Sequence, residues 1–137
     1  MKFFTVLITA SVLAACGTPS SDEEKVRALV ASVEAAAEAR DTSDVLTRVA
    51  PDYSDKQGLD KSQLQNFLRG YFLSHPKIEL LVKIESLEFP AEGLARARIG
   101  VASVTLDQWG GDTVTLDVEL RRHDGDWLVT RADRVAR

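Results

Sequence analysis

Apolar residues recur at helical spacing in the first half of this 137-residue chain and alternate with polar residues in the second half. Beyond an apolar N-terminal stretch, three segments have a period near 3.6, at about 22–40, 43–49 and 60–74. The second ends before Pro51, because a proline disfavours helix in the residue before it. From Lys77 onward the period is two, as in half-buried strands. The pattern predicts an α+β protein with three N-terminal helices followed by an antiparallel sheet.

Two of the predicted helices begin with a clear capping signal. Ser21 with Glu24, and Asp60 with Gln63, have the spacing of a capping box, in which two side chains satisfy free N–H groups at the helix start. The third helix then presents a wide apolar stripe, which we interpret as core packing and which consists of Leu64, Phe67, Leu68, Tyr71 and Phe72.

The first two predicted strands pair around a turn at 90–93. The facing pairs in this register are Phe89–Ala95, Glu88–Arg96, Leu87–Ala97 and Ile84–Ile99. The last pair requires one extra residue near Glu85 and Ser86, which is the count of a β-bulge. Because bulges bend and twist strands, we expect a strongly curved sheet of four strands.

A second hairpin closes the chain around the turn Asp124-Gly125. Its expected facing pairs are Leu120–Val129 and Arg122–Trp127. Strict alternation beyond them turns Arg131 and Asp133 toward the interior, where they would line a cavity. A bulge near Thr130 would instead turn both outward, and the sequence leaves these alternatives open.

The N-terminal stretch is typical of a secretory signal. Lys2 precedes an apolar run at 3–13, which is too short to span a bilayer as a helix, since spanning takes about 20 residues. Small residues then lead to Cys16, which is the only cysteine. The segment Leu13-Ala14-Ala15-Cys16 resembles the lipobox of bacterial lipoproteins.

This resemblance implies a domain organisation and a location. Residues 1–15 would be a signal peptide, and 16–21 would be a lipidated Cys16 with a short linker to a domain at 22–137. We expect attachment to a membrane of the bacterial cell envelope, facing the periplasm. Gly17 after the cysteine favours the outer over the inner membrane. The alternative is an ordinary cleaved signal peptide with Cys16 as a chance thiol.

The composition excludes several classes of function. Without residues 1–15 the chain carries 16 basic and 21 acidic side chains, a formal charge of −5, and has no basic cluster for nucleic acid. A lipidated Cys16 leaves no thiol for a disulfide. His75 and His123 are the only histidines, and neither has the spacing of a metal ligand, so we expect no metal and no cofactor. The arginines near the C-terminus either meet an anionic ligand or lipid head groups, or pair with the acidic first helix.

The order of elements resembles the nuclear transport factor 2-like (NTF2-like) superfamily, whose domains form a cystatin-like cone. The resemblance covers about 22–135 and rests on the long first helix, the short second helix leading into 51–55, the third helix, the long bulged strands and the closing hairpin. It implies a pocket between the helices and the concave sheet face, and in many relatives a homodimer through the open face of the sheet. Enzymes of the superfamily use a carboxylate or histidine base with Tyr or Asp donors.

The residues that could supply such chemistry here are Tyr53, Asp55, Tyr71, His75 and Asp133. Each also has a structural interpretation, as a turn, helix-cap or packing residue. None aligns onto a catalytic set, and the mid-strand positions that hold acids in the isomerases are apolar here. The sequence therefore favours a non-catalytic envelope lipoprotein whose cone binds an apolar small molecule or a protein partner. The alternative is a small lyase or isomerase that acts on an envelope metabolite.

Overall fold

The computed structural model describes residues 21–104 and 113–135, so the predictions for the signal segment and Cys16 lie outside the described residues. The helices are α1 (Asp22–Glu38), α2 (Thr42–Leu46) and α3 (Lys61–Ser74). The strands are β1 (Leu80–Ala91), β2 (Leu94–Ser103), β3 (Thr113–His123) and β4 (Asp126–Arg134). They form one antiparallel sheet in the order β1-β2-β3-β4. The predicted α+β class is confirmed.

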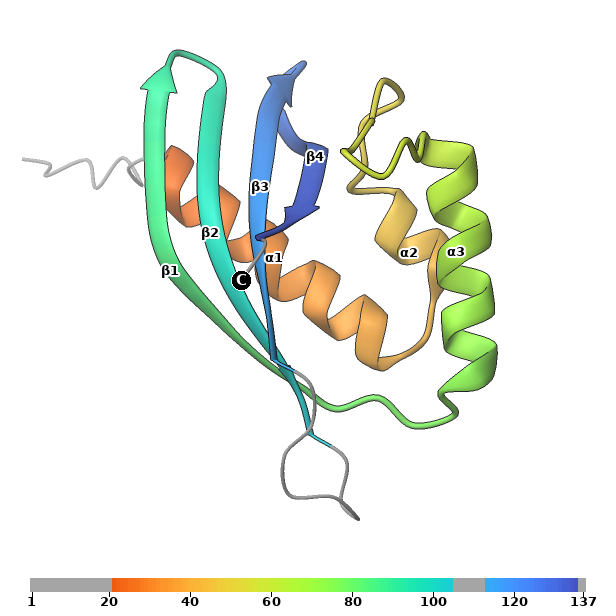
Figure 1. The fold of residues 1–137 in the computed structure, drawn as a ribbon. Coiled ribbons are helices and arrows are strands. Elements are labelled where there is room, and N and C mark those ends of the chain that lie inside the picture. The colour runs from red at the N-terminus through yellow and green to blue at the C-terminus, as the bar shows by residue number, and fades with distance from the viewer. Residues whose placement is uncertain (1–20, 105–112, 136–137) are drawn as a thin grey trace, which may run out of the picture.

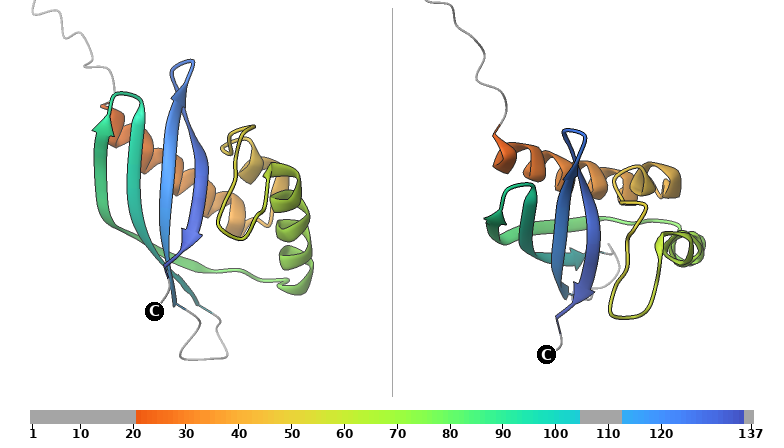
Figure 2. Two further views of the ribbon diagram at one scale, coloured as in Figure 1. Left: turned by 45° about the horizontal axis from the view of Figure 1, so that its top comes forward. Right: turned by 90° about the horizontal axis from the view of Figure 1, so that it is seen from above.

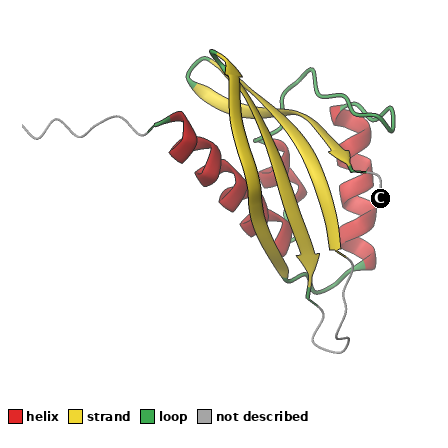
Figure 3. Ribbon diagram, turned by 60° about the vertical axis from the view of Figure 1, so that its left-hand side comes forward, coloured by secondary structure: helices red, strands yellow, loops and turns green. Residues whose placement is uncertain are grey.

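The sheet is curved and has one covered face. Helix α1 crosses behind the strands in Figure 1, while α2 and α3 stand beyond β4. The same arrangement is visible from above in Figure 2, and Figure 3 shows the strands bending around the helices. We call the face against α1 the inner face and the opposite one the outer face. No helix in the described ranges is long and apolar enough to cross a membrane.

The helix starts are those the sequence predicts. The side chain of Ser21 accepts a hydrogen bond from the Glu24 amide at 3.2 Å, and Asp60 and Gln63 form both bonds of a capping box. The second helix, however, ends at Leu46 rather than near residue 49. The reason is tertiary, because the backbone of 48–50 hydrogen-bonds to Val129 on the edge of β4 instead of continuing the helix.

The first hairpin contains the predicted bulge and a second irregularity. The pairs Ile84–Ile99 and Leu87–Ala97 are confirmed, with Glu85 as the extra residue. The predicted pair Phe89–Ala95 is wrong, since a second register shift falls between Glu88 and Ala91 and the chain turns at 92–93. Phe89 packs edge-on against Trp127 of β4, with ring centroids 5.9 Å apart.

The second hairpin shows which of the two alternatives for Arg131 and Asp133 in β4 is right. Asp124 and Gly125 both have positive φ, the type I′ geometry that Asp-Gly favours. The pairs Leu120–Val129 and Arg122–Trp127 are confirmed. Glu119 pairs with Arg131 while Leu120 pairs with Val129, so Thr130 is the extra residue of a bulge. Its hydroxyl donates to the Glu119 carbonyl at 3.2 Å.

This bulge changes which face of the sheet each side chain at the end of β4 points to. Ala132 packs against the core on the inner face, whereas Arg131 and Asp133 turn to the outer face. The interpretation in which Arg131 and Asp133 line the interior is therefore wrong, because one inserted residue shifts the two-residue alternation by one position.

The core lies between α1 and the inner face. Val26 of α1 is fully buried and packs with Leu120 and Trp127 from the second hairpin and with apolar residues of β2. Two smaller clusters join α2 and α3 to this core, one around Phe72 and one around Tyr53. The residues of all three clusters lie between Val26 and Ala132, so we treat residues 17–137 as a folding unit for the experiments below.

The start of α1 is fixed to the second hairpin through Asp22. Its carboxylate accepts a hydrogen bond from the Trp127 indole at 3.2 Å and pairs with Arg122 at 3.3 Å. The Arg122 guanidinium also lies over the Trp127 ring, 5.8 Å from its centroid. The expected pairing of a late arginine with the acidic first helix is confirmed at this position.

We predict that Asp22→Ala lowers the free energy of unfolding by about 1–2 kcal/mol, because it leaves the buried Trp127 indole without its acceptor. Glu23→Ala is the matched control, since the one polar side-chain contact of Glu23 within the described residues is an exposed ion pair with Arg27, and we expect a loss of less than about 0.5 kcal/mol. Urea denaturation followed by tryptophan fluorescence measures both. Equal losses in the two variants would contradict the role given to Asp22.

Candidate functional site: an apolar cavity inside the cone

A cavity of about 270 Å³ lies between the helices and the inner face of the sheet. All three helices and the segment after α2 form one wall, and all four strands contribute to the other. The lining includes Leu29, Val33, Ala37 and Leu68 from the helices and Val82, Ile99, Val101, Leu116 and Val129 from the strands. Each of these side chains belongs to the helical or alternating apolar pattern of the sequence. The positions that form the core therefore also line the cavity.

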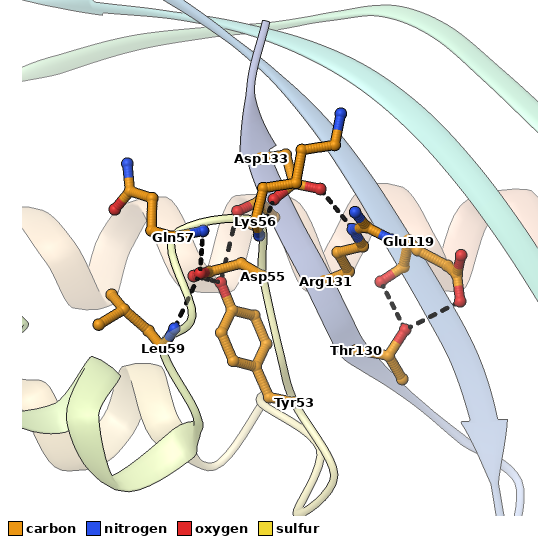
Figure 4. Close-up of polar contacts among 10 residues, drawn as sticks. Tyr53, Asp55, Lys56, Gln57, Leu59, Glu119, Thr130, Arg131 and Asp133 are labelled. Carbon is orange, nitrogen blue, oxygen red and sulfur yellow. Dashed lines mark hydrogen bonds and ion pairs between the residues drawn. The ribbon is translucent and has the colours of Figure 1, made fainter.

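The wall of the cavity is almost entirely carbon. Among the described residues that line it, only Glu34 and Tyr53 have a side chain that can ionise. The ring of Tyr53 faces the cavity, but its hydroxyl donates a hydrogen bond to Asp55 at 2.8 Å (Figure 4). The same hydroxyl lies 3.4 Å from the Ala132 carbonyl oxygen. The cavity can therefore bury the apolar surface of a ligand but offers few groups that could hydrogen-bond to it.

Tyr53 stays protonated at neutral pH. Burial raises the pKa of its hydroxyl, and the hydrogen bond to Asp55 and the negative charge of that carboxylate raise the pKa further. Tyr53 can therefore donate a hydrogen bond but cannot serve as a base. Its single proton is already engaged by Asp55.

Asp55 organises the loop between α2 and α3. Besides the Tyr53 hydroxyl, its side chain accepts hydrogen bonds from the amides of Gln57 at 3.0 Å and Leu59 at 3.1 Å. These bonds satisfy backbone donors in a tight turn, as Asp side chains commonly do. The geometry therefore supports the turn interpretation of Asp55, and the residue does not line the cavity.

Asp133 is buried under the same loop on the outer side of β4. Its carboxylate accepts a hydrogen bond from the Lys56 amide at 2.7 Å and pairs with Arg131 (Figure 4). Burial alone would raise the pKa of the Asp133 carboxyl, but the bonds from Lys56 and Arg131 outweigh it and hold the pKa below its usual value. The carboxylate is thus ionised and fully engaged in positioning the loop.

Tyr71 and His75 lie near the end of α3 and do not line the cavity. Their rings stack with centroids 4.0 Å apart, and His75 is the C-cap residue, with Nδ1 2.8 Å from the Tyr71 carbonyl oxygen. The predicted stripe of α3 is only partly core. Phe72 is buried, whereas Phe67 is 56% exposed and Tyr71 is 37% exposed.

The five candidate residues are therefore not brought together into one catalytic set. Tyr53 and Asp55 are hydrogen-bonded, and Asp133 lies near them through the Lys56 loop, while Tyr71 and His75 form a separate pair on α3. Sequence reasoning did not single out Glu34, although its place one residue after Val33 on the inward side of the first helix is a usable signal. Within 21–104 and 113–135, no three His, Cys, Asp or Glu side chains gather in a way that could hold a metal ion.

No protein-family model matches the chain, and a comparison with curated proteins finds no match. Solved structures do match. An NTF2-like protein of unknown function from Pseudomonas putida has 19% identity and a TM-score of 0.67, with 87% of this chain and 90% of that chain covered. A Shewanella oneidensis NTF-2 like protein has 14% identity, 83% and 98% coverage and a TM-score of 0.67.

A protein with a cystatin-like fold from Nostoc punctiforme gives 13% identity, covers 82% of this chain and 89% of that one, and has a TM-score of 0.70. At these identities the comparisons show the fold alone. The chain has the NTF2-like, or cystatin-like, cone fold, as the element order predicts.

We predict that Asp133→Asn lowers the free energy of unfolding by about 1–2 kcal/mol at pH 7, because it removes the ion pair with Arg131. A carboxyl whose pKa is lowered on folding stabilises the protein above its unfolded pKa, and this contribution is lost as the pH falls through the folded pKa. The difference between the wild type and Asp133→Asn should therefore shrink below about pH 4. Urea denaturation at several pH values measures it, and a difference that stays constant down to pH 2 would contradict the assignment.

Proposed function

We propose that the chain is a lipid-anchored envelope protein whose cone binds a small apolar molecule without changing it chemically. The observation that carries this proposal is the carbon-walled cavity of about 270 Å³ inside the cone. Burial of apolar surface contributes roughly 25 cal/mol per Å², so such a space favours a molecule that needs no hydrogen bonds inside it.

The size of the cavity limits the ligand. Pockets for drug-sized ligands run from about 300 to 1,000 Å³, so a cavity of this volume suits a smaller molecule, such as a short acyl chain or a compound of one or two rings. The ligand is held by shape and by exclusion of water. Any polar end would have to lie toward Glu34 or in solvent, since the Tyr53 hydroxyl is engaged by Asp55.

A catalytic role, as a lyase or isomerase acting on an envelope metabolite, is the alternative. It requires an acid or base aimed at the substrate, usually within about 3 Å of the proton that moves. Asp55 and Asp133 are both engaged by backbone amides away from the cavity, which leaves Glu34 as the lining carboxylate. Turnover of an isomerase or dehydratase substrate that is lost in Glu34→Gln would replace the binding proposal with this one.

The membrane anchor is supported by the lipobox-like segment that ends at Cys16. Stable anchoring takes about two acyl chains, which a lipidated N-terminal cysteine provides without a spanning helix. Because only five residues separate Cys16 from Asp22, where α1 begins, the domain would stay close to the bilayer surface. We propose that it faces the periplasm, with the outer membrane favoured over the inner one by Gly17.

We predict that Ala37→Phe weakens binding of the neutral fluorophore phenylnaphthylamine at least about tenfold, because the larger ring occupies the cavity. Ala31→Phe is the matched control, since Ala31 lies on the same helix but is exposed, and its affinity should equal that of the wild type. Fluorescence titration of residues 17–137 measures both. No binding by the wild type, or equal binding by both variants, would contradict the cone as a ligand site.

We also predict that Cys16→Ala abolishes incorporation of labelled palmitate when the full chain is expressed in a bacterium, and moves the protein out of the membrane fraction. The control Ser20→Ala changes the linker only and should leave both unchanged. A wild-type chain that takes up no palmitate would show that the signal peptide is an ordinary one. That result would not affect the fluorescence titration, which tests ligand binding by the cone separately.

A further inference from the structure

The apolar cavity inside the cone has an acidic residue in its wall and no basic one. None of the described residues that line the cavity is a lysine, an arginine or a histidine. Tyr53 stays protonated and its hydroxyl is bound to Asp55, so Tyr53 contributes no charge. Among the described lining residues, Glu34 is therefore the one that can give the cavity a charge.

Glu34 lies at the margin of the cavity. Its side chain is half-buried on α1, so it contacts both the interior and the solvent. Because the wall is almost entirely carbon, Glu34 contributes mainly its methylene groups to the wall, and its carboxylate lies toward the solvent. A ligand whose apolar end fills the cavity would therefore bring its other end beside this carboxylate.

The Glu34 carboxylate has no partner among the described residues, where its side chain takes part in no hydrogen bond or ion pair. The nearest basic residues along the chain on either side are Arg27 and Arg40. Arg27 pairs with Glu23 at 3.1 Å, and Arg40 donates a hydrogen bond to the Phe72 carbonyl at 3.1 Å. Both are engaged elsewhere, so the Glu34 carboxylate is free to pair with a cation on a ligand.

A second carboxylate, that of Glu38, lies four residues further along α1. It accepts a hydrogen bond from the Leu80 amide at the start of β1, at 3.3 Å. Two like charges at this spacing on a helix destabilise it, because they lie side by side on its surface. A cation beside Glu34 would relieve this repulsion, whereas an anion in the same place would add to it.

We propose that the cone prefers an apolar molecule that carries a positive charge at one end, such as an amine with a short alkyl or aromatic tail. The tail fills the cavity, and the ammonium group pairs with Glu34 at the margin. This inference rests on the proposed function, because it names the class of ligand that the same cavity takes up.

The preference follows from the end group of the ligand. Moving a charge out of water costs far more than moving a hydroxyl group, unless the charge meets an opposite one. In a cavity without a counter-charge, an alcohol would therefore bind more tightly than an ammonium or a carboxylate with the same tail. Beside Glu34 the order changes, since a hydrogen bond between charged groups is roughly twice as strong as one between neutral groups.

Displacement of phenylnaphthylamine from residues 17–137 by octylammonium, octanol and octanoate at pH 7 tests the proposal. The three probes share one alkyl chain and end in a cation, a neutral group and an anion. We expect octylammonium to bind at least about fivefold more tightly than octanol, and octanoate to bind most weakly. In Glu34→Gln, which keeps the shape of the side chain and removes its charge, octanol should bind at least as tightly as octylammonium.

Glu24→Gln is the matched control, since it makes the same chemical change at an exposed position of α1 that does not line the cavity. It should leave the order of the three probes as in the wild type. Ala37→Phe, which fills the cavity, should weaken octylammonium at least about tenfold, because the tail loses its place. Unfolding curves verify that each variant folds.

Octanol that binds the wild type as tightly as octylammonium overturns the inference but leaves the cone as a site for apolar ligands. A preference for octylammonium that persists in Glu34→Gln overturns it too, as does unchanged octylammonium binding in Ala37→Phe. A wild type that binds neither the fluorophore nor any of the three probes overturns the proposed function together with this inference.

Discussion

The extra residue Thr130 in β4 determines what lies on each face of the sheet. Before it, Trp127 and Val129 point to the inner face, and after it Ala132 does, so the cavity and core stay apolar along the whole strand. Without the bulge the alternation would bring Arg131 and Asp133 inside. Burial of an ion pair in that space would cost several kcal/mol of desolvation, and the cone would lose its carbon wall.

The same bulge fixes the loop that closes the side of the cone. Asp133, turned outward, accepts the Lys56 amide, and the backbone of Ser54 donates to the Thr130 carbonyl at 3.2 Å. This loop carries Tyr53, whose ring lines the cavity and whose hydroxyl is held by Asp55. Tyr53, Asp55 and Asp133, three of the residues considered for catalysis, are thus groups that hold this wall in place.

Much of the fold could be predicted from the sequence, because the signals were local. The caps at Ser21 and Asp60 and the bulge at Glu85 follow from spacing alone. The end of α2 could not be predicted, since it depends on hydrogen bonds between 48–50 and β4, which lies about 80 residues away in the chain. The predicted pairing of Phe89 with Ala95 was wrong for a different reason. A second bulge just before a short turn gives the same sequence of apolar residues as a longer turn without a bulge.

The sequence predicted the type of site, an apolar cone interior, but not the placement of the polar residues beside it. An apolar cone interior follows from the alternation of β2 and β3. The direction of the Asp133 side chain, however, depends on the bulge at Thr130, and the sequence left the presence of this bulge open. The most direct test of an open apolar cone is a crystal of residues 17–137 under xenon pressure, because xenon enters dry apolar cavities. We predict xenon density among Val33, Leu68 and Val82. A cone filled by these side chains, with no xenon bound, would contradict the account.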